Sequence, residues 1–167
     1  MDPFSPAQIA GYGALVLGVS AFLQKSDRRL MALNSAQSLA YAVHYFLMGN
    51  LPACGSSLFS SIRSAAAIRT HSARLALALV LLNLGMGAYI ARGLLGWLPV
   101  AGSCIATVAM FTLYGIRLRL VLLCCTAMWL TMNVATGSIG GTVLESFIAL
   151  ANLSTIVRML RARRRAP

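Results

Sequence analysis

Acidic side chains are almost absent from this sequence. Its 167 residues include three of them, Asp2, Asp27 and Glu145, against 14 lysines and arginines. Charged residues of both signs make up 10% of the chain, whereas a soluble domain carries about a quarter. So little polar surface cannot cover a globule in water. Because 59% of the residues are hydrophobic, we expect lipid to solvate most of the protein.

Motifs of catalysis and metal binding are also lacking. There is no HExxH, no P-loop, no GxGxxG and no nucleophile with a convincing His and acid. The four cysteines form no CxxC pair and have no nearby ligand to complete a metal site. We therefore expect no enzyme activity, no metal and no cofactor, and we interpret the cysteines as small apolar side chains.

Apolar runs separated by short polar breaks predict an all-α membrane protein with seven transmembrane helices. The predicted helices cover residues 7–24, 30–48, 52–69, 75–91, 94–114, 118–136 and 142–158. A helical crossing needs about 20 residues, so seven crossings use nearly the whole chain. We expect one transmembrane domain over residues 1–167. The N-terminus has no basic segment ahead of its first apolar run, so we expect that run to be retained as a helix.

The basic residues fall on one side of these crossings. Thirteen of the 14 lie in or near the first, third and fifth breaks and the C-terminal tail, and Arg92 alone lies on the other side. Such a split predicts an outer N-terminus and a cytoplasmic C-terminus. The arginines occur in small groups between apolar runs, so the net charge of +11 does not predict nucleic-acid binding.

A shift of the numbering by 88 aligns the beginning of the chain with its end. Arg29-Leu30 then falls on Arg117-Leu118, and Gly49 falls on Gly137. This predicts a 3+1+3 plan, in which residues 7–70 and 94–160 form two three-helix repeats and residues 73–92 form a linker helix. The linker restores the orientation and makes the repeats parallel, a layout of transporters that bind substrate between the halves. Duplication that merely builds a stable bundle is the alternative.

Polar and aromatic side chains recur at three- and four-residue spacing on the two middle helices of these repeats. On the first they are Asn34, Gln37, Ser38, Tyr41, His44, Tyr45 and Met48, and on the second Cys125, Thr126, Trp129, Met132, Asn133 and Thr136. Each set forms one stripe along a helix face. The stripes either line a cavity between the repeats or hydrogen-bond neighbouring helices as packing contacts.

Two charged side chains lie within apolar runs. Glu145 shares a helix face with Asn152, and it is either a substrate or proton site or a carboxylate favoured by a helix N-terminus. Arg63 either meets the same cavity from the opposite repeat or extends to the cytoplasmic interface. His44 is either a group that titrates near neutral pH or a structural donor.

Several segments resemble the YgjV family of bacterial inner-membrane proteins, namely FLQKSDRRL, AVHYFLMGNLPA, SSIRS, GWLPVAGSCIAT and TGSIGGTVLE. The resemblance spans nearly the whole chain and implies location and topology. The 3+1+3 plan is also similar to that of SWEET and PnuC-type transporters. The Pro-Gln hinge of SWEET repeats is not evident, since Ala7 follows Pro6 and Val100 follows Pro99. The second YgjV repeat tends to carry a His where this chain has Met132.

The leading interpretation is a small-solute transporter or facilitator with its site between the repeats. The predicted substrate-binding residues are Tyr41, His44, Arg63, Trp129, Asn133, Glu145 and Asn152. The alternative is a non-transporting membrane protein with a structural or partner-binding role. The expected partners are the bilayer and a small solute; whether the chain forms a homo-oligomer is left open.

Reporter fusions at the two termini test the number of crossings. An odd number of helices places the ends on opposite sides of the membrane, so a cytoplasmic reporter should be active at the C-terminus and inactive at the N-terminus. Reporters that find both ends on the same side would refute seven crossings.

Overall fold

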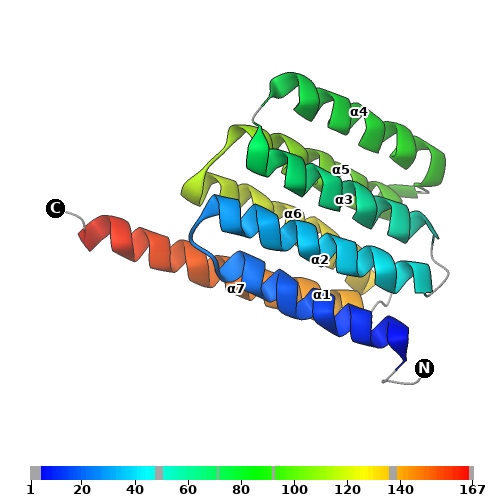
Figure 1. Cartoon of the computed structure of the whole chain (residues 1–167), viewed down its shortest axis with the longest axis horizontal. Helices are drawn as coiled ribbons and strands as arrows, with labels where there is room; N and C mark the ends of the chain where they lie inside the picture. The colour runs from blue at the N-terminus through cyan, green and yellow to red at the C-terminus, as the bar shows by residue number, and fades with distance from the viewer. Residues whose placement is uncertain (1–4, 48–50, 71, 92, 136–138, 166–167) are drawn as a thin grey trace.

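The computed structural model describes residues 5–47, 51–70, 72–91, 93–135 and 139–165, without the side chains of residues 8, 45, 51–53, 56, 133, 139–140 and 165. These residues form seven helices (Figure 1). They are α1 (Pro6–Leu23), α2 (Asp27–Leu47), α3 (Leu51–Arg69), α4 (Ala73–Ile90), α5 (Gly93–Thr112), α6 (Gly115–Ala135) and α7 (Ile139–Arg165). The predicted turns at Gly49 and Gly137 lie outside the described residues, as does Arg92.

The all-helical prediction is confirmed, and the largest difference is at a basic helix end. α7 continues seven residues past the predicted end at Arg158, and α2, α6 and α7 each begin three residues earlier than predicted. Arginine and lysine are good helix formers, and their long side chains reach water without leaving the helix. A boundary set by hydropathy alone therefore stops short of the true helix end.

The helices pack in two rows of three with α4 at one edge. α2 lies between α1 and α3, and α6 lies between α5 and α7. α1 also contacts α7, and α3 contacts α5, which joins the rows at both edges. α4 packs mainly on α5 and lies at the margin of the bundle (Figure 1).

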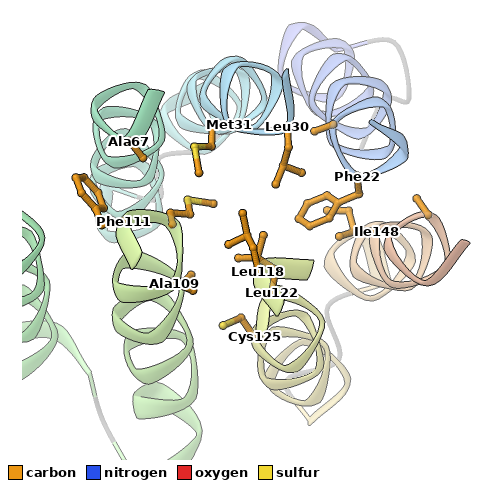
Figure 2. Packing of buried hydrophobic residues seen from close by; sticks show 14 of the residues in the cluster. Phe22, Leu30, Met31, Ala67, Ala109, Phe111, Leu118, Leu122, Cys125 and Ile148 are labelled. Carbon is orange, nitrogen blue, oxygen red and sulfur yellow. The ribbon is translucent and has the colours of Figure 1, made fainter. Parts of the chain in front are cut away.

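Apolar side chains fill the space between the two rows. Leu30 and Met31 of α2 point toward Leu118 and Leu122 of α6, as Figure 2 shows. All four side chains are at most 3% exposed. The space between α2 and α6 at this level is therefore lined by apolar side chains.

Small residues let neighbouring helices approach closely at two places. They repeat along one face of α1 and along one face of α5. On α1 they are Gly11, Ala14, Gly18 and Ala21, and on α5 they are Pro99, Gly102, Ala106 and Ala109. A Cβ atom on Gly18 would lie 3.3 Å from Gln37 of α2, and one on Gly102 would lie 3.6 Å from Trp129 of α6. Such stripes are typical of helix contacts in membranes, where close backbone approach replaces the hydrophobic drive.

Four helices of the described chain are long and apolar enough to cross a membrane. The apolar windows lie in α4, α5, α6 and α7, and α1 contributes a shorter apolar stretch, Ile9–Leu23. α2 and α3, whose side chains are described in part, carry polar side chains that bond one another. Asn34 donates to Ser64 at 2.8 Å, and the Ser35 hydroxyl is 3.1 Å from that of Ser61. Pairing of this kind lowers the cost of polar groups in lipid.

The basic residues gather at one end of the bundle. Because successive helices alternate in direction, the turns after α1, α3 and α5 lie at the same end as the C-terminus (Figure 1). Lys25, Arg28, Arg69, Arg117 and Arg158 are all exposed there. The N-terminus lies at the opposite end.

Two glycines of α4 give a matched test of the α4–α5 contact. A Cβ on Gly87 would lie 2.7 Å from Val100, whereas one on Gly85 would meet nothing within 4 Å. Both alanine variants gain helix propensity of up to about 1 kcal/mol. Gly87→Ala also overpacks the contact, at a cost of about 1–3 kcal/mol. In detergent, Gly87→Ala should melt at a lower temperature than Gly85→Ala; equal melting would contradict this packing.

Candidate functional site

Arg63 lies between α3 and α5, in the C-terminal half of α3. Its guanidinium Nη1 donates to the Ser103 carbonyl at 2.9 Å, to the Ser103 hydroxyl at 2.8 Å and to the Thr107 hydroxyl at 3.3 Å. The side chain is 5% exposed, and its Nε has no hydrogen-bond partner among the described residues. Arg63 therefore points into the bundle, and the alternative that it extends to the interface is wrong.

Among the described residues, the hydrogen-bond partners of Arg63 are polar and carry no negative charge. Every described acceptor is a hydroxyl or a carbonyl, and no described carboxylate forms an ion pair with Arg63. Cys104 and Cys125 lie nearby as free thiols. Arg63 precedes the end of α3 by six residues, or roughly 9 Å of helix. A buried cation at this depth costs up to about 2.5–3.5 kcal/mol on insertion scales and marks a candidate functional site.

A second buried arginine, Arg119, is held by an ion pair. Its Nη2 lies 3.2 Å from Oδ1 of Asp27, and its side chain is fully buried. The other carboxylate oxygen, Oδ2, accepts from the backbone N–H of Gly115 at 2.6 Å. Gly115 is the first residue of α6 and has φ +59, a conformation that suits glycine. Asp27 thus caps α6 from the start of α2, where the helix dipole favours a negative charge.

Sequence reasoning did not find the Asp27–Arg119 pair. It treated Arg119 as one of the loop residues that set orientation, whereas the structure places Arg119 in the second turn of α6. The available signal was that Asp27 is one of only three acidic residues and sits among bases at a helix start. A spacing of 92 residues gave no reason to pair them.

Tyr41 and His44 lie together at the end of the bundle that holds the N-terminus. Their ring centroids are 5.8 Å apart in an edge-on arrangement, and Nδ1 of His44 is 2.7 Å from the Ala7 carbonyl. A Cβ on Gly11 would lie 3.1 Å from this imidazole. His44 therefore contacts α1, which supports its interpretation as a structural group.

Trp129 packs on α5 in a corresponding way. Its indole lies over Gly102, within 3.6 Å of a Cβ built there. Its neighbours in the stripe, Cys125 and Thr126, are buried. The side chain of Asn133, and the whole of Thr136, lie outside the described part of the structure.

Glu145 and Asn152 share α7 but have different surroundings. Asn152 is fully buried and donates to the Arg119 carbonyl at 2.9 Å, while its Oδ1 has no described partner. Glu145 is half-buried, six residues after the start of α7, and has no hydrogen bond or ion pair to a described residue. Arg63 and Glu145 therefore do not pair in this conformation.

The predicted residues whose side chains are described line neither of two grooves of the described structure. These grooves are lined by residues of α5, α6, the turn between them and the end of α7. Arg63 and Asn152 lie toward the basic end, and Tyr41, His44, Trp129 and Glu145 lie toward the other. Of the seven predicted residues, Arg63 is the one whose charged side chain forms described hydrogen bonds from one row of helices to the other.

Substitution of Asp27 tests the ion pair. In Asp27→Asn, Arg119 stays buried without a charge partner. We expect a loss of about 2–3 kcal/mol, less than for a fully buried pair, because Asp27 is 19% exposed. Thermal unfolding in detergent measures the loss.

Glu145→Gln is the matched control for this variant, since it removes a carboxylate that has no described partner. It should melt close to wild type. In an Arg119→Gln background the Asp27 substitution should have a smaller effect, because the interaction is already lost. Additive effects of the two substitutions would contradict the pairing.

Comparison with known proteins places the chain in one family. The family model of Imp-YgjV, bacterial inner membrane protein, matches residues 5–163. "Inner membrane protein YgjV" of Escherichia coli (strain K12) is 33% identical over 165 residues, which cover 99% of this chain and 90% of that protein. No solved structure gives a significant match. The chain therefore belongs to the Imp-YgjV family and is a multi-pass protein of the bacterial inner membrane.

Proposed function

We propose that this protein is a small-solute transporter or facilitator, with Arg63 as the centre of its binding site. The solute binds between two parallel three-helix repeats, α1–α3 and α5–α7, which α4 connects. The role is non-enzymatic. The observation that carries the proposal is the buried guanidinium of Arg63, whose described partners are all neutral.

Corresponding contacts in the two rows of helices support the repeats. The small residues of α1 fall on those of α5 when the numbering is shifted by 88, and Tyr41 falls on Trp129. Each of these aromatic residues belongs to the middle helix of its row. Asp27 and Gly115, which bond each other, are also 88 residues apart. Equivalent positions of two repeats contact each other near the axis that relates the repeats. The contact between Asp27 and Gly115 is therefore expected if that axis runs along the membrane normal between α2 and α6.

The charge distribution supports an outer N-terminus and a cytoplasmic C-terminus. Exposed bases cluster at the end of the bundle that holds the C-terminus, and positive residues are retained on the cytoplasmic side. Arg63 then lies in the cytoplasmic half of the membrane, and Glu145 lies in the outer half.

The chemistry of Arg63 favours an anionic solute. A guanidinium binds carboxylate and phosphate through paired N–H donors, and the unpartnered Nε is such a donor. The Ser103 and Thr107 hydroxyls hold the side chain in place from α5. Because the α2–α6 core is filled by apolar side chains, this conformation is closed, and access requires the two rows to separate.

Glu145 is the group we assign to ion coupling. It is the only described carboxylate without a described partner, and its position in the outer half leaves it accessible to protons from that side. Tyr41, His44, Trp129, Asn133 and Asn152 complete the proposed site as residues that shape the passage.

Uptake into proteoliposomes tests the proposal. A mixture of labelled carboxylate and phosphate metabolites is offered to vesicles that contain the protein. Wild type should take up at least one of them, and Arg63→Ala should reduce that uptake by about tenfold or more, as loss of a charged contact of ~1.4 kcal/mol or above implies. Arg63→Lys keeps the charge and should retain part of the uptake.

Arg69→Ala is the matched control, since Arg69 is an exposed base on the same helix. It should transport like wild type. Glu145→Gln should lose the response to a pH gradient and keep uptake without one. Equal loss in Arg63→Ala and Arg69→Ala would contradict a site at Arg63, and wild-type behaviour of Glu145→Gln would remove proton coupling.

A non-transporting role is the second candidate, and the apolar side chains between α2 and α6 favour it. In that case Arg63 is a packing group. Thermal stabilisation by a library of anionic metabolites separates the two, because a ligand that binds the native state raises its melting temperature. A hit that Arg63→Ala abolishes supports the solute site, and stabilisation by no compound supports the rival.

A further inference from the structure

Two adjoining grooves run along α5 and α6 toward the basic end of the bundle. The first, of about 320 Å³, is lined by Cys104, Ile105, Val108, Ala109, Leu113 and Val121. The second, of about 360 Å³, is lined by Thr112, Leu113, Tyr114, Ile116, Arg117 and Arg163. Leu113 lines both, so an apolar groove leads directly into a basic one.

The apolar groove lies within the part of α5 that crosses the membrane. Its lining extends from Cys104 of α5 to Leu113, the residue that directly follows the end of α5, over about 13 Å. Ile105 and Val108 are 44% and 48% exposed at its edge, which places it on the outer surface of the bundle. At this depth the molecules that contact the surface are acyl chains.

The basic groove lies where α5 ends, α6 begins and α7 continues past its neighbours. Arg117 is the third residue of α6. Arg158 of α7 contacts Leu23, the last residue of α1, and Arg163 lies five positions further along α7. Both arginines are exposed. This level corresponds to the lipid headgroups, just beyond the apolar crossing.

The charge of this groove is not neutralised by the described protein. No carboxylate lines it. Of the described acids, Asp27 is bound to Arg119 and Gly115, and Glu145 lies toward the opposite end of the bundle. Two guanidiniums that line one groove match a phosphate group, to which arginine donates in pairs.

We infer that the joined grooves bind an anionic phospholipid of the leaflet that meets the basic end. The phosphate lies between Arg117 and Arg163, and one acyl chain follows the groove from Leu113 toward Cys104. Basic pockets between transmembrane helices recognise anionic headgroups by this combination of charge and depth. The inference does not depend on transport, because it concerns a surface that none of the proposed solute-binding residues lines.

Native mass spectrometry of the full chain in neutral detergent tests the inference. The probes are phosphatidylglycerol and phosphatidylcholine with identical acyl chains, and glycerol 3-phosphate as the headgroup alone. Phosphatidylglycerol should bind about tenfold more tightly than phosphatidylcholine, and Arg117→Gln with Arg163→Gln should abolish this preference. Glycerol 3-phosphate should bind far more weakly, since it lacks the acyl chain.

The matched control is Arg161→Gln with Arg164→Gln, which removes two exposed charges from the same tail without changing the groove. It should keep the preference. Val108→Trp should block the apolar part with both arginines in place, whereas Val43→Trp, on an exposed face of α2, should not. Unchanged melting in detergent without added lipid shows that each variant folds.

Three results would overturn the inference. If the groove double variant and the control double variant lose phosphatidylglycerol binding equally, the lipid is attracted to the basic surface as a whole and not to the groove. Equal binding of both lipids would remove the phosphate site. Equal binding of glycerol 3-phosphate and phosphatidylglycerol would remove the acyl-chain groove.

Discussion

A membrane offers no water to the polar groups inside it, and this constraint determines which helices lie together. The polar side chains of α2 and α3 bond each other through Asn34, Ser35, Ser61 and Ser64, and Thr155 of α7 donates to the Phe22 carbonyl at the end of α1. Each bond contributes about a kcal/mol or less, yet an unpaired group in lipid costs more. These bonds therefore favour the contact of α2 with α3 and that of α1 with α7.

The same constraint separates the two buried arginines. Arg119 lies close to the basic end and has a carboxylate, that of Asp27, which also caps α6. Arg63 lies deeper, and its partners in the described part of the chain are all neutral. The ion pair of Arg119 with Asp27 supports the contact between α6 and α2. One that is buried without a counter-charge is costly to the fold and is explained more readily by function than by stability.

The sequence predicted the candidate site in part. It selected Arg63 because a charged residue inside an apolar run is costly wherever the run crosses lipid, and the structure buries that side chain. It did not predict where the two polar stripes face. His44 and Trp129 lie on small residues of α1 and α5, and periodicity identifies a helix face without naming the helix that covers it.

The sequence by itself determined the seven helices, their order and the gathering of bases at one end, because hydropathy and charge act over about 20 neighbouring residues. Only the tertiary structure decided that Arg63 bonds Ser103 and that Asp27 bonds Arg119, at separations of 40 and 92 residues. Such contacts depend on the rotation and depth of whole helices, which the packing of all of them sets together.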